Sequence, residues 1–320
     1  RAISFGQNMT TLNFALARAI ARQIREGDEV VVTQLDHEAN RGPWKTLVER
    51  GAVLREIPLR EDGTLEMRAL DSLVGAKTRV VAIGWASNAI GTVNDVALAV
   101  RAARAAGALS VIDAVHYAPH FAIDAAAVDP DFLLCSAYKF YGPHVGILYS
   151  RPGALDALEP DRLVTQDQQA PFRIETGTLN HAALAGVTAA IEYIASFGEG
   201  GSRRERIVSA MTRLHAHEHA LASRYWKSLD RLKRVRRWGQ DFTSPHRAPT
   251  VSITVEGMTA RAVTERLAAK GLAVWDGDFY ARRAVELFGL SGNGGLVRSG
   301  MAMYTTEGEV DRLARAVNEI

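Results

Sequence analysis

The chain has 320 residues, of which 47% are hydrophobic and 23% are charged, and its formal net charge is +2. A chain of this size and composition buries a large core, and we expect two domains. The small net charge argues against a nucleic-acid-binding protein. One basic stretch, residues 231–237, alternates with apolar residues, so we interpret it as a solvated face or an edge of the structure.

Cys135 is the only cysteine, which excludes an internal disulfide and a cysteine-rich metal site and fits a reducing, cytoplasmic setting. The longest apolar runs, such as 80–86 and 96–100, are too short to cross a bilayer, and the first residues lack a signal-peptide pattern. We therefore expect no membrane partner. The chain begins at Arg1 rather than at a methionine and runs directly into a helical pattern, so we expect that the natural N-terminus precedes it.

The first half of the chain alternates short β-branched segments with helical patterns, which predicts a mostly parallel sheet joined by crossover helices. The expected strands are residues 29–33, 53–57, 80–85, 109–112, 132–135 and 146–149. The expected helices are residues 9–25, 41–50, 67–74 and 96–106. This is the pattern of an α/β domain.

The second half begins with two long helical segments, 181–196 and 203 to about 229, separated by glycines. The remaining elements are expected to be a strand at 250–255, a helix at 259–270, strands at 272–275 and about 296–303, and a terminal helix. We therefore predict a large domain over residues 1–235, with a linking helix at about 203–229. A small α+β domain is predicted over residues 236–320.

A lysine in an unusual setting is the first sign of chemistry. Lys139 lies in the aromatic segment 136–143, directly after an apolar strand, whereas the other lysines lie on polar helix faces or in loops. The chain also lacks the glycine fingerprints of dinucleotide and nucleoside-triphosphate sites. The apolar, aromatic setting of Lys139 suits a lysine that forms a Schiff base, because desolvation and nearby positive charge lower the pKa of its amine. The alternative is a surface lysine whose ammonium reaches solvent.

An acidic residue, Asp113, follows the apolar strand at 109–112, where doubly wound sheets place their ligands. A carboxylate at this place can pair with a pyridinium nitrogen and keep the ring protonated. The alternative is an aspartate that caps a helix.

These motifs and those below occur in the same order as in the class V aminotransferases, and the resemblance covers nearly the whole chain. It is strongest to the cysteine desulfurases and a desulfurase-like subfamily. The resemblance implies the aspartate-aminotransferase-like fold (fold type I), pyridoxal 5′-phosphate (PLP) bound to Lys139, and a small amino acid as substrate. In the family's D-x-x-H element, Asp113 matches the partner of the pyridine nitrogen and His116 the partner of the ring hydroxyl.

Further positions follow from the same resemblance. The stretch 35–44 resembles H-x-x-N-x-x-P-W, whose histidine stacks on the cofactor ring, and this residue is His37. Its imidazole is also expected to move a proton near the substrate Cα. Met9 and Thr10 match the phosphate-binding start of the first helix. Ser136 matches a hydroxyl donor to the phosphate, and Tyr138 replaces a histidine that often precedes the lysine.

Two loops and one strand complete the resemblance. Thr178, in the segment 175–180, matches a threonine that reaches the phosphate of the neighbouring subunit, which implies a homodimer. Asn88 matches a residue near the cofactor hydroxyl and the substrate carboxylate, although it is also a plausible turn residue. Arg298 matches the arginine that grips the substrate carboxylate with two hydrogen bonds.

One departure concerns the loop at 273–281, where Tyr280 stands at the position of the cysteine that accepts sulfur in desulfurases. Cys135 is expected to be a buried packing residue. We therefore expect a PLP-dependent enzyme acting on a small amino acid, with transamination, β-elimination and racemisation all open. A desulfurase or lyase with another sulfur acceptor is one alternative. A non-catalytic scaffold or sensor of the same fold is the other.

Overall fold

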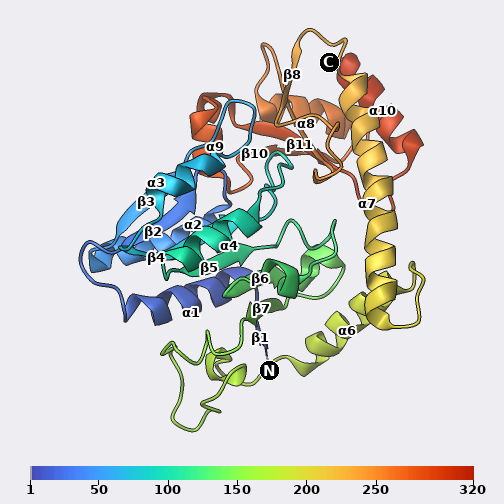
Figure 1. Ribbon diagram of the computed structural model, residues 1–320. Helices are drawn as coiled ribbons and strands as arrows, with labels where there is room; N and C mark the ends of the chain where they lie inside the picture. Colours follow the sequence, from blue (N-terminus) through green and yellow to red (C-terminus); the bar gives the residue numbers. More distant parts are fainter. Residues whose placement is uncertain (1) are drawn as a thin grey trace.

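A computed structural model describes residues 2–320, and its largest element is a seven-stranded sheet with the order β1-β7-β6-β5-β4-β2-β3 (Figure 1). The pairs from β6 to β3 are parallel, whereas β7 and β1 are added antiparallel at one edge. The chain thus has the mixed, mostly parallel sheet that the alternating pattern predicts. The strands are β1 (Ile3–Gly6), β2 (Glu29–Thr33), β3 (Val53–Ile57), β4 (Thr78–Gly84), β5 (Leu109–Asp113), β6 (Phe132–Ser136) and β7 (Gly146–Ser150).

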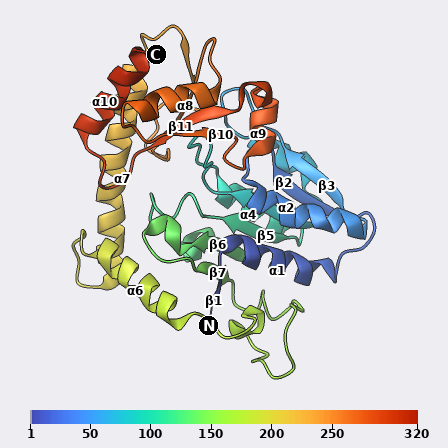
Figure 2. The same cartoon turned by 180° about the vertical axis from the view of Figure 1, so that it is seen from behind.

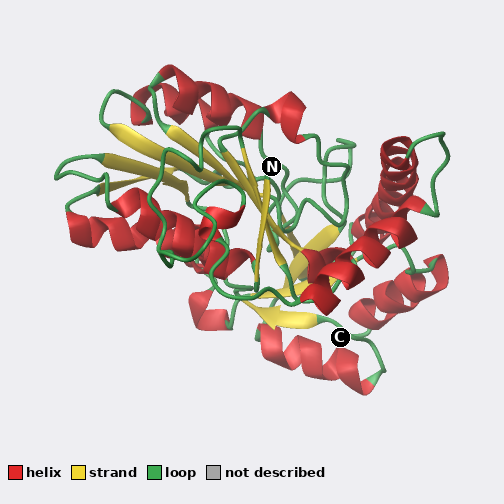
Figure 3. Cartoon of the chain, turned by 90° about the horizontal axis from the view of Figure 1, so that it is seen from below, coloured by secondary structure: helices red, strands yellow, loops and turns green. Residues whose placement is uncertain are grey.

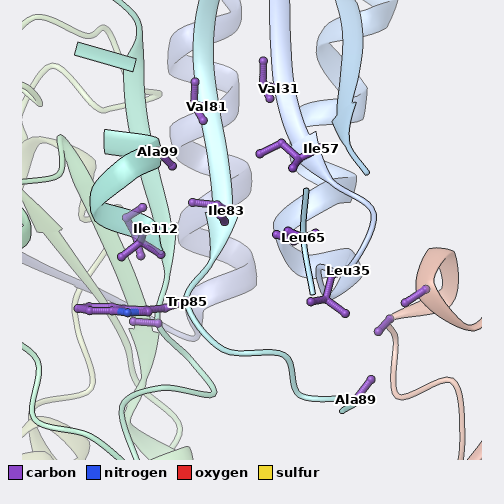
Figure 4. Packing of buried hydrophobic residues seen from close by; sticks show 14 of the residues in the cluster. Val31, Leu35, Ile57, Leu65, Val81, Ile83, Trp85, Ala89, Ala99 and Ile112 are labelled. Carbon is purple, nitrogen blue, oxygen red and sulfur yellow. The ribbon is translucent and has the colours of Figure 1, made fainter. Parts of the chain in front are cut away.

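Helices cover both faces of this sheet (Figure 3). Successive side chains of a strand point to opposite faces. Val30 and Val32 therefore pack in the cluster that contains α1 (Met9–Ala21), whereas Val31 packs in the cluster that contains α4 (Val96–Ala105). Figure 4 shows the second cluster, in which Val81, Ile83 and Ile112 lie with Ala99 of α4. Burial on both faces explains why the central strands read as continuous apolar runs.

A second, antiparallel sheet has the order β10-β11-β9-β8. Its strands are β8 (Val235–Trp238), β9 (Thr250–Val255), β10 (Trp275–Gly277) and β11 (Leu296–Gly300). Helices α8 (Ala260–Ala269) and α10 (Glu307–Asn318) form a separate core with this sheet and the end of α7 (Arg203–Ser228). The basic stretch contributes β8, which is an edge strand as interpreted from its alternating pattern.

The long helix α7 joins the two halves of the chain. It follows α6 (His181–Ala195) and runs along one side of the molecule to the second sheet (Figures 1 and 2). A capping box at Ser202 and Glu205 fixes its beginning. The shorter helices are α2 (Glu38–Lys45), α3 (Leu70–Leu73), α5 (Ala125–Val128) and α9 (Arg282–Leu287). No helix among residues 2–320 combines the length and apolar character needed to cross a membrane.

Several boundaries differ from the sequence prediction. The helix expected at 41–50 begins earlier, at Glu38, because the His37 side chain accepts the hydrogen bond of an N-cap; it becomes a 3₁₀ turn after Lys45. The strand expected at 272–275 lies instead at 275–277, where its register is set by pairing with β11. Strand β11 ends at Gly300, because a turn between Ala302 and Thr305 follows it.

Candidate functional site

A cavity of about 400 Å³ lies where the carboxyl ends of the central parallel strands face the second sheet. Parallel α/β sheets bind ligands at this edge, and the volume suits a small cofactor with its substrate. All predicted site residues except Thr178 line it. They are Met9, Thr10, His37, Asn88, Asp113, His116, Ser136, Tyr138, Lys139, Tyr280 and Arg298.

Lys139 is presented to the cavity by a short 3₁₀ turn, Ala137–Phe140, that follows β6. Hydrogen bonds from the Ala137 N–H to the Val145 carbonyl and from the Gly142 N–H to the Ala137 carbonyl close this turn. The ammonium is open to the cavity, and the cleft walls lower its pKa by desolvation; the charge of Arg298 lowers it further. Both effects favour the neutral amine, which is the nucleophilic form.

Asp113 is the last residue of β5 and is 8% exposed. Its Oδ1 accepts a hydrogen bond from the Val115 N–H at 2.9 Å, and no basic side chain among residues 2–320 forms an ion pair with it. Burial raises the pKa of this carboxyl to about 7, with a further rise from the nearby Asp36. A buried carboxylate without a cation is costly, so the site favours a positively charged ligand here.

Asp36 is a neighbour of Asp113 that the sequence motifs did not indicate. It is 4% exposed and accepts hydrogen bonds from the Gly84 N–H at 2.9 Å and from the Asn40 side chain at 3.1 Å. Burial raises its pKa to about 6. The signal that could have revealed it is the one used for Asp113: an acidic residue shortly after the carboxyl end of an apolar strand.

His37 caps α2, since its Nδ1 accepts a hydrogen bond from the Ala39 N–H at 2.9 Å. Its ring lies in the cavity wall beside the ring of Tyr280, with 5.3 Å between centroids. Burial, followed by the charges of Lys139 and Arg298, lowers the pKa of His37 to about 4. The imidazole is therefore neutral at physiological pH, and its Nδ1 is already engaged by the backbone.

His116 points toward the second sheet, where its Nε2 lies 2.9 Å from the Thr250 hydroxyl of β9. Burial lowers its pKa well below the usual range, and the neighbouring His120 adds to this effect. The ring edge is thereby fixed by a contact between the two sheets. The sequence did not predict this hydroxyl partner.

Ser136 and the beginning of α1 meet at one end of the cavity. The Met9 N–H donates to the Ser136 Oγ at 2.9 Å, and Asn8 caps the helix by accepting from the Thr11 N–H. A side chain in place of Gly146 would collide with the Asn8 backbone, so only glycine allows β7 to approach so closely. The site therefore presents a helix N-terminus next to a hydroxyl, which favours an anion.

Arg298 enters the cavity from β11. One terminal NH₂ group donates to the Asn88 carbonyl at 2.7 Å, and the guanidinium carbon lies 4.2 Å from the centroid of the Phe279 ring. The Asn88 side chain donates to the Phe279 carbonyl at 2.7 Å. Burial lowers the Arg298 pKa to about 10, and no carboxylate within residues 2–320 forms an ion pair with this cation. The geometry leaves its charge available to an anionic ligand.

Two predicted residues are more exposed. The ring of Tyr138 stacks on His144 at 4.6 Å, and the Lys139 Nζ lies 5.3 Å from its centroid. Thr178 is exposed in the loop before α6 and does not line the cavity of its own chain. Its predicted role requires a second subunit.

The comparison with protein families agrees with this architecture. Residues 1–313 match the family model described as aminotransferase class-V. The chain belongs to the class V aminotransferase family. Members of this family generally use PLP.

Similar proteins include cysteine desulfurases. The one from Synechococcus elongatus is 32% identical over 94% of this chain, and the one from Enterobacter sp. is 33% identical over 93% of it. The chain spans 47% of the first relative's length and 72% of the second's. The crystal structure of the cysteine desulfurase CsdA from Escherichia coli gives a TM-score of 0.89 at 26% identity, covering 99% of this chain and 78% of CsdA. These matches confirm the fold predicted from the motifs.

Proposed function

We propose that this class V aminotransferase family member is a PLP-dependent enzyme that acts on a small α-amino acid. The observation that carries the proposal is a set of charged side chains in one cavity that lack ion-pair partners. Among residues 2–320, neither Asp113 nor Arg298 forms an ion pair, and Lys139, which lines the same cavity, has a lowered pKa. Each of these groups suits one part of the cofactor or of an amino acid.

The residues fit the cofactor in the following way. Asp113 would hold the pyridine nitrogen, because a buried carboxylate with a raised pKa is stabilised by a cation. The beginning of α1 and Ser136 would hold the phosphate. His37 would cover the ring, and His116, whose orientation Thr250 fixes, would face the ring hydroxyl.

When bound, the cofactor supplies an electron sink for charge that develops at the substrate Cα. Lys139 would hold the cofactor and then take or return the proton at that carbon, since its neutral amine is a competent base. Arg298 would orient the substrate through its carboxylate, and Asn88 would hold Arg298 in place. His37 would be a neutral ring at physiological pH, and its lowered pKa and engaged Nδ1 make it a weak base, so its main part would be to cover the cofactor ring.

Reduction with borohydride tests the central assignment. We expect the reduced protein to carry a pyridoxyl group on the peptide that contains Lys139, and we expect Lys139→Ala to lose it. Lys45→Ala, which changes an exposed helix lysine, is the matched control. A pyridoxyl group on another lysine would refute the role of Lys139. A protein that takes up cofactor but shows no spectral change with any amino acid would favour the non-catalytic alternative.

Cysteine is a candidate substrate, because the similar proteins are named cysteine desulfurases. The residues of this chain favour a route without a protein persulfide. Cys135 is buried in β6, and burial raises its pKa to about 12, so its thiolate is scarce at neutral pH. The loop beside the cavity presents Tyr280 instead, and a phenol cannot form a transferable disulfide-type bond.

A sulfide-release assay with cysteine separates the routes. If sulfide forms, we expect equal rates in the wild type and in Cys135→Ser, because elimination at the substrate needs no protein thiol. Sulfide production that disappears in Cys135→Ser would show that Cys135 is the sulfur acceptor. It would overturn the proposed route.

A further inference from the structure

The turn that contains Asn88 is held by the second half of the chain in an unusual way. The carbonyls of four successive residues, 88–91, each accept a hydrogen bond from the region of the second sheet. In order along the turn, the donors are Arg298, the Ser252 hydroxyl, Arg247 and the Ala248 N–H. The same turn therefore joins the two sheets and contains the Asn88 carbonyl, which holds the Arg298 guanidinium.

Arg247 is the charged group in this junction that solvent cannot reach. It is 1% exposed, and one of its NH₂ groups donates to the Ile90 carbonyl at 2.6 Å. Its guanidinium carbon lies 4.4 Å from the centroid of Phe242 and 5.3 Å from that of Trp226. Its Nε and its other NH₂ nitrogen have no hydrogen-bond partner within residues 2–320.

Burial of this cation is expensive, and burial lowers its pKa to about 10. An apolar residue would fill the aromatic pocket without unpaired nitrogens, but it would leave the Ile90 carbonyl without the donor that Arg247 supplies. Gly91, with φ = 77°, also has no room for a side chain, since a Cβ there would meet the Arg247 guanidinium. The turn and the arginine therefore fit one another closely, although two of the arginine nitrogens stay unpaired.

We propose that Arg247 is a positioning residue for recognition of the substrate carboxylate, an inference that rests on the proposed role of Arg298. By holding the Ile90 carbonyl, Arg247 fixes the turn two residues from the Asn88 carbonyl, which in turn holds the Arg298 guanidinium. Without this hold the turn shifts, and Arg298 loses its orientation toward the carboxylate. Arg247 itself does not line the cavity.

The test compares two ligands of the cofactor-loaded protein by their effect on its visible absorbance. L-alanine has a carboxylate, and ethylamine is the same molecule without it. For Arg247→Met we expect the half-saturating concentration of L-alanine to rise roughly tenfold, which corresponds to the loss of one well-placed hydrogen bond, with that of ethylamine unchanged. Arg236→Met is the matched control, because Arg236 also stacks on a tryptophan but is exposed at the sheet edge.

A second measurement needs no cofactor. The amides of Ser87 and Gly91 are hydrogen-bonded within the turn, so we expect their hydrogen exchange to accelerate in Arg247→Met and to stay unchanged in the control. Normal exchange together with an unchanged ratio of the two ligand affinities would overturn the proposal. An equal loss of both ligands, with a lowered unfolding temperature, would overturn it as well, because it indicates a merely structural role.

Two further variants separate these outcomes from misfolding of Arg247→Met and from failure of the proposed role of Arg298. If Arg247→Met does not fold, Arg247→Lys replaces it in the test. Lysine retains the charge, but its ammonium is too compact to reproduce the guanidinium contact. An unchanged ratio of the L-alanine and ethylamine affinities in Arg247→Lys would contradict the proposal. Arg298→Ala tests the proposed role of Arg298 in binding the substrate carboxylate, on which the inference rests. If Arg298→Ala leaves L-alanine binding intact, the proposed role of Arg298 fails, and the positioning role fails with it. An effect of Arg298→Ala without one of Arg247→Met refutes only the positioning role.

Discussion

Asp113 is a single residue on which the electrostatics of the cavity depend. Its carboxyl accepts one backbone hydrogen bond, and burial beside Asp36 raises its pKa to about 7. The neighbouring sheet strands fix its backbone, because Gly84 and Leu134 pair with it on either side. The residue therefore has little freedom to turn away from the cavity and expose its charge to water.

We predict that Asp113→Asn binds PLP but turns over substrate roughly a hundredfold more slowly or worse, because the amide cannot stabilise a protonated pyridine nitrogen. The change leaves the proposed phosphate site at Ser136 and α1 intact. Cofactor content and turnover are measured on the same preparation. Near-normal turnover would remove Asp113 from this role.

The same variant has a predictable effect on the stability of the cofactor-free protein. The carboxyl titrates near 3.8 in the unfolded chain and near 7 in the folded protein, so the folded protein keeps a proton that the unfolded chain has lost in this window. Ionisation of Asp113 therefore destabilises the fold as the pH rises through it. We predict that Asp113→Asn gains stability over the wild type between pH 4 and pH 8, by up to about 4 kcal/mol.

Thermal unfolding of both proteins across this pH range checks the prediction. Taking the difference between the two proteins cancels the contribution of His37, whose lowered pKa does not depend on Asp113. The contribution of Asp36 cancels only in part, because its charge acts on Asp113. If the difference in stability between the two proteins does not change with pH, ionisation of Asp113 does not destabilise the fold, and the prediction is wrong.

At the scale of elements, the segment 275–280 forms one wall of the cavity and contains a strained pair. Phe279 and Tyr280 have φ values of 53° and 59°, in the left-handed region that costs a non-glycine residue on the order of 1–3 kcal/mol. Three hydrogen bonds hold the pair. The Asn88 side chain donates to the Phe279 carbonyl, the Glu38 N–H donates to the Tyr280 carbonyl, and the Tyr280 N–H donates to the Asp278 side chain. The strain places the Tyr280 ring beside His37 at the mouth of the cavity.

We predict that Tyr280→Phe retains the cofactor and changes the rate or the preference among amino acids severalfold, because the ring stays in place while a hydrogen-bond donor is lost. Tyr304→Phe is the control, since Tyr304 is exposed to a similar degree, 74% against 68% for Tyr280, but does not line the cavity. Substrate profiles of the two variants provide the measurement. Identical profiles would leave Tyr280 without a part in substrate recognition.

Elements with a strong periodic pattern were predicted from the sequence, and weak ones were not. The bounds of β2, β3 and β9 agree with the prediction residue by residue, because each is a short segment rich in β-branched residues and bounded by turns. Strand β1 and helix α9 were missed, since a four-residue edge strand and a six-residue helix carry little periodicity. The site residues followed from strand ends and motifs. The junction around Arg247 did not, because it depends on contacts between segments more than 150 residues apart.

At the scale of the whole molecule, Thr178 does not line the cavity of the chain to which it belongs. The loop that carries Thr178 is anchored at its start by the hydrogen bond from the Phe5 N–H to the Glu175 carboxylate at 2.7 Å. Large apolar side chains are exposed in the preceding segment, with Val164 97% and Phe172 51% exposed. Exposed apolar side chains of this kind fit a surface that a second subunit covers.

We therefore predict a homodimer in which Thr178 of each subunit completes the phosphate site of the other. Coexpression of Lys139→Ala with Thr178→Ala provides the test. In such a heterodimer the cavity with an intact Lys139 receives the intact Thr178 from its partner, so about half of the sites regain wild-type retention of cofactor during dialysis. If Thr178 acts within its own chain, or if the protein is a monomer, every cavity keeps one defect and no retention returns. Purified Thr178→Ala alone must first lose cofactor faster than the wild type, and equal retention there would already contradict the phosphate role.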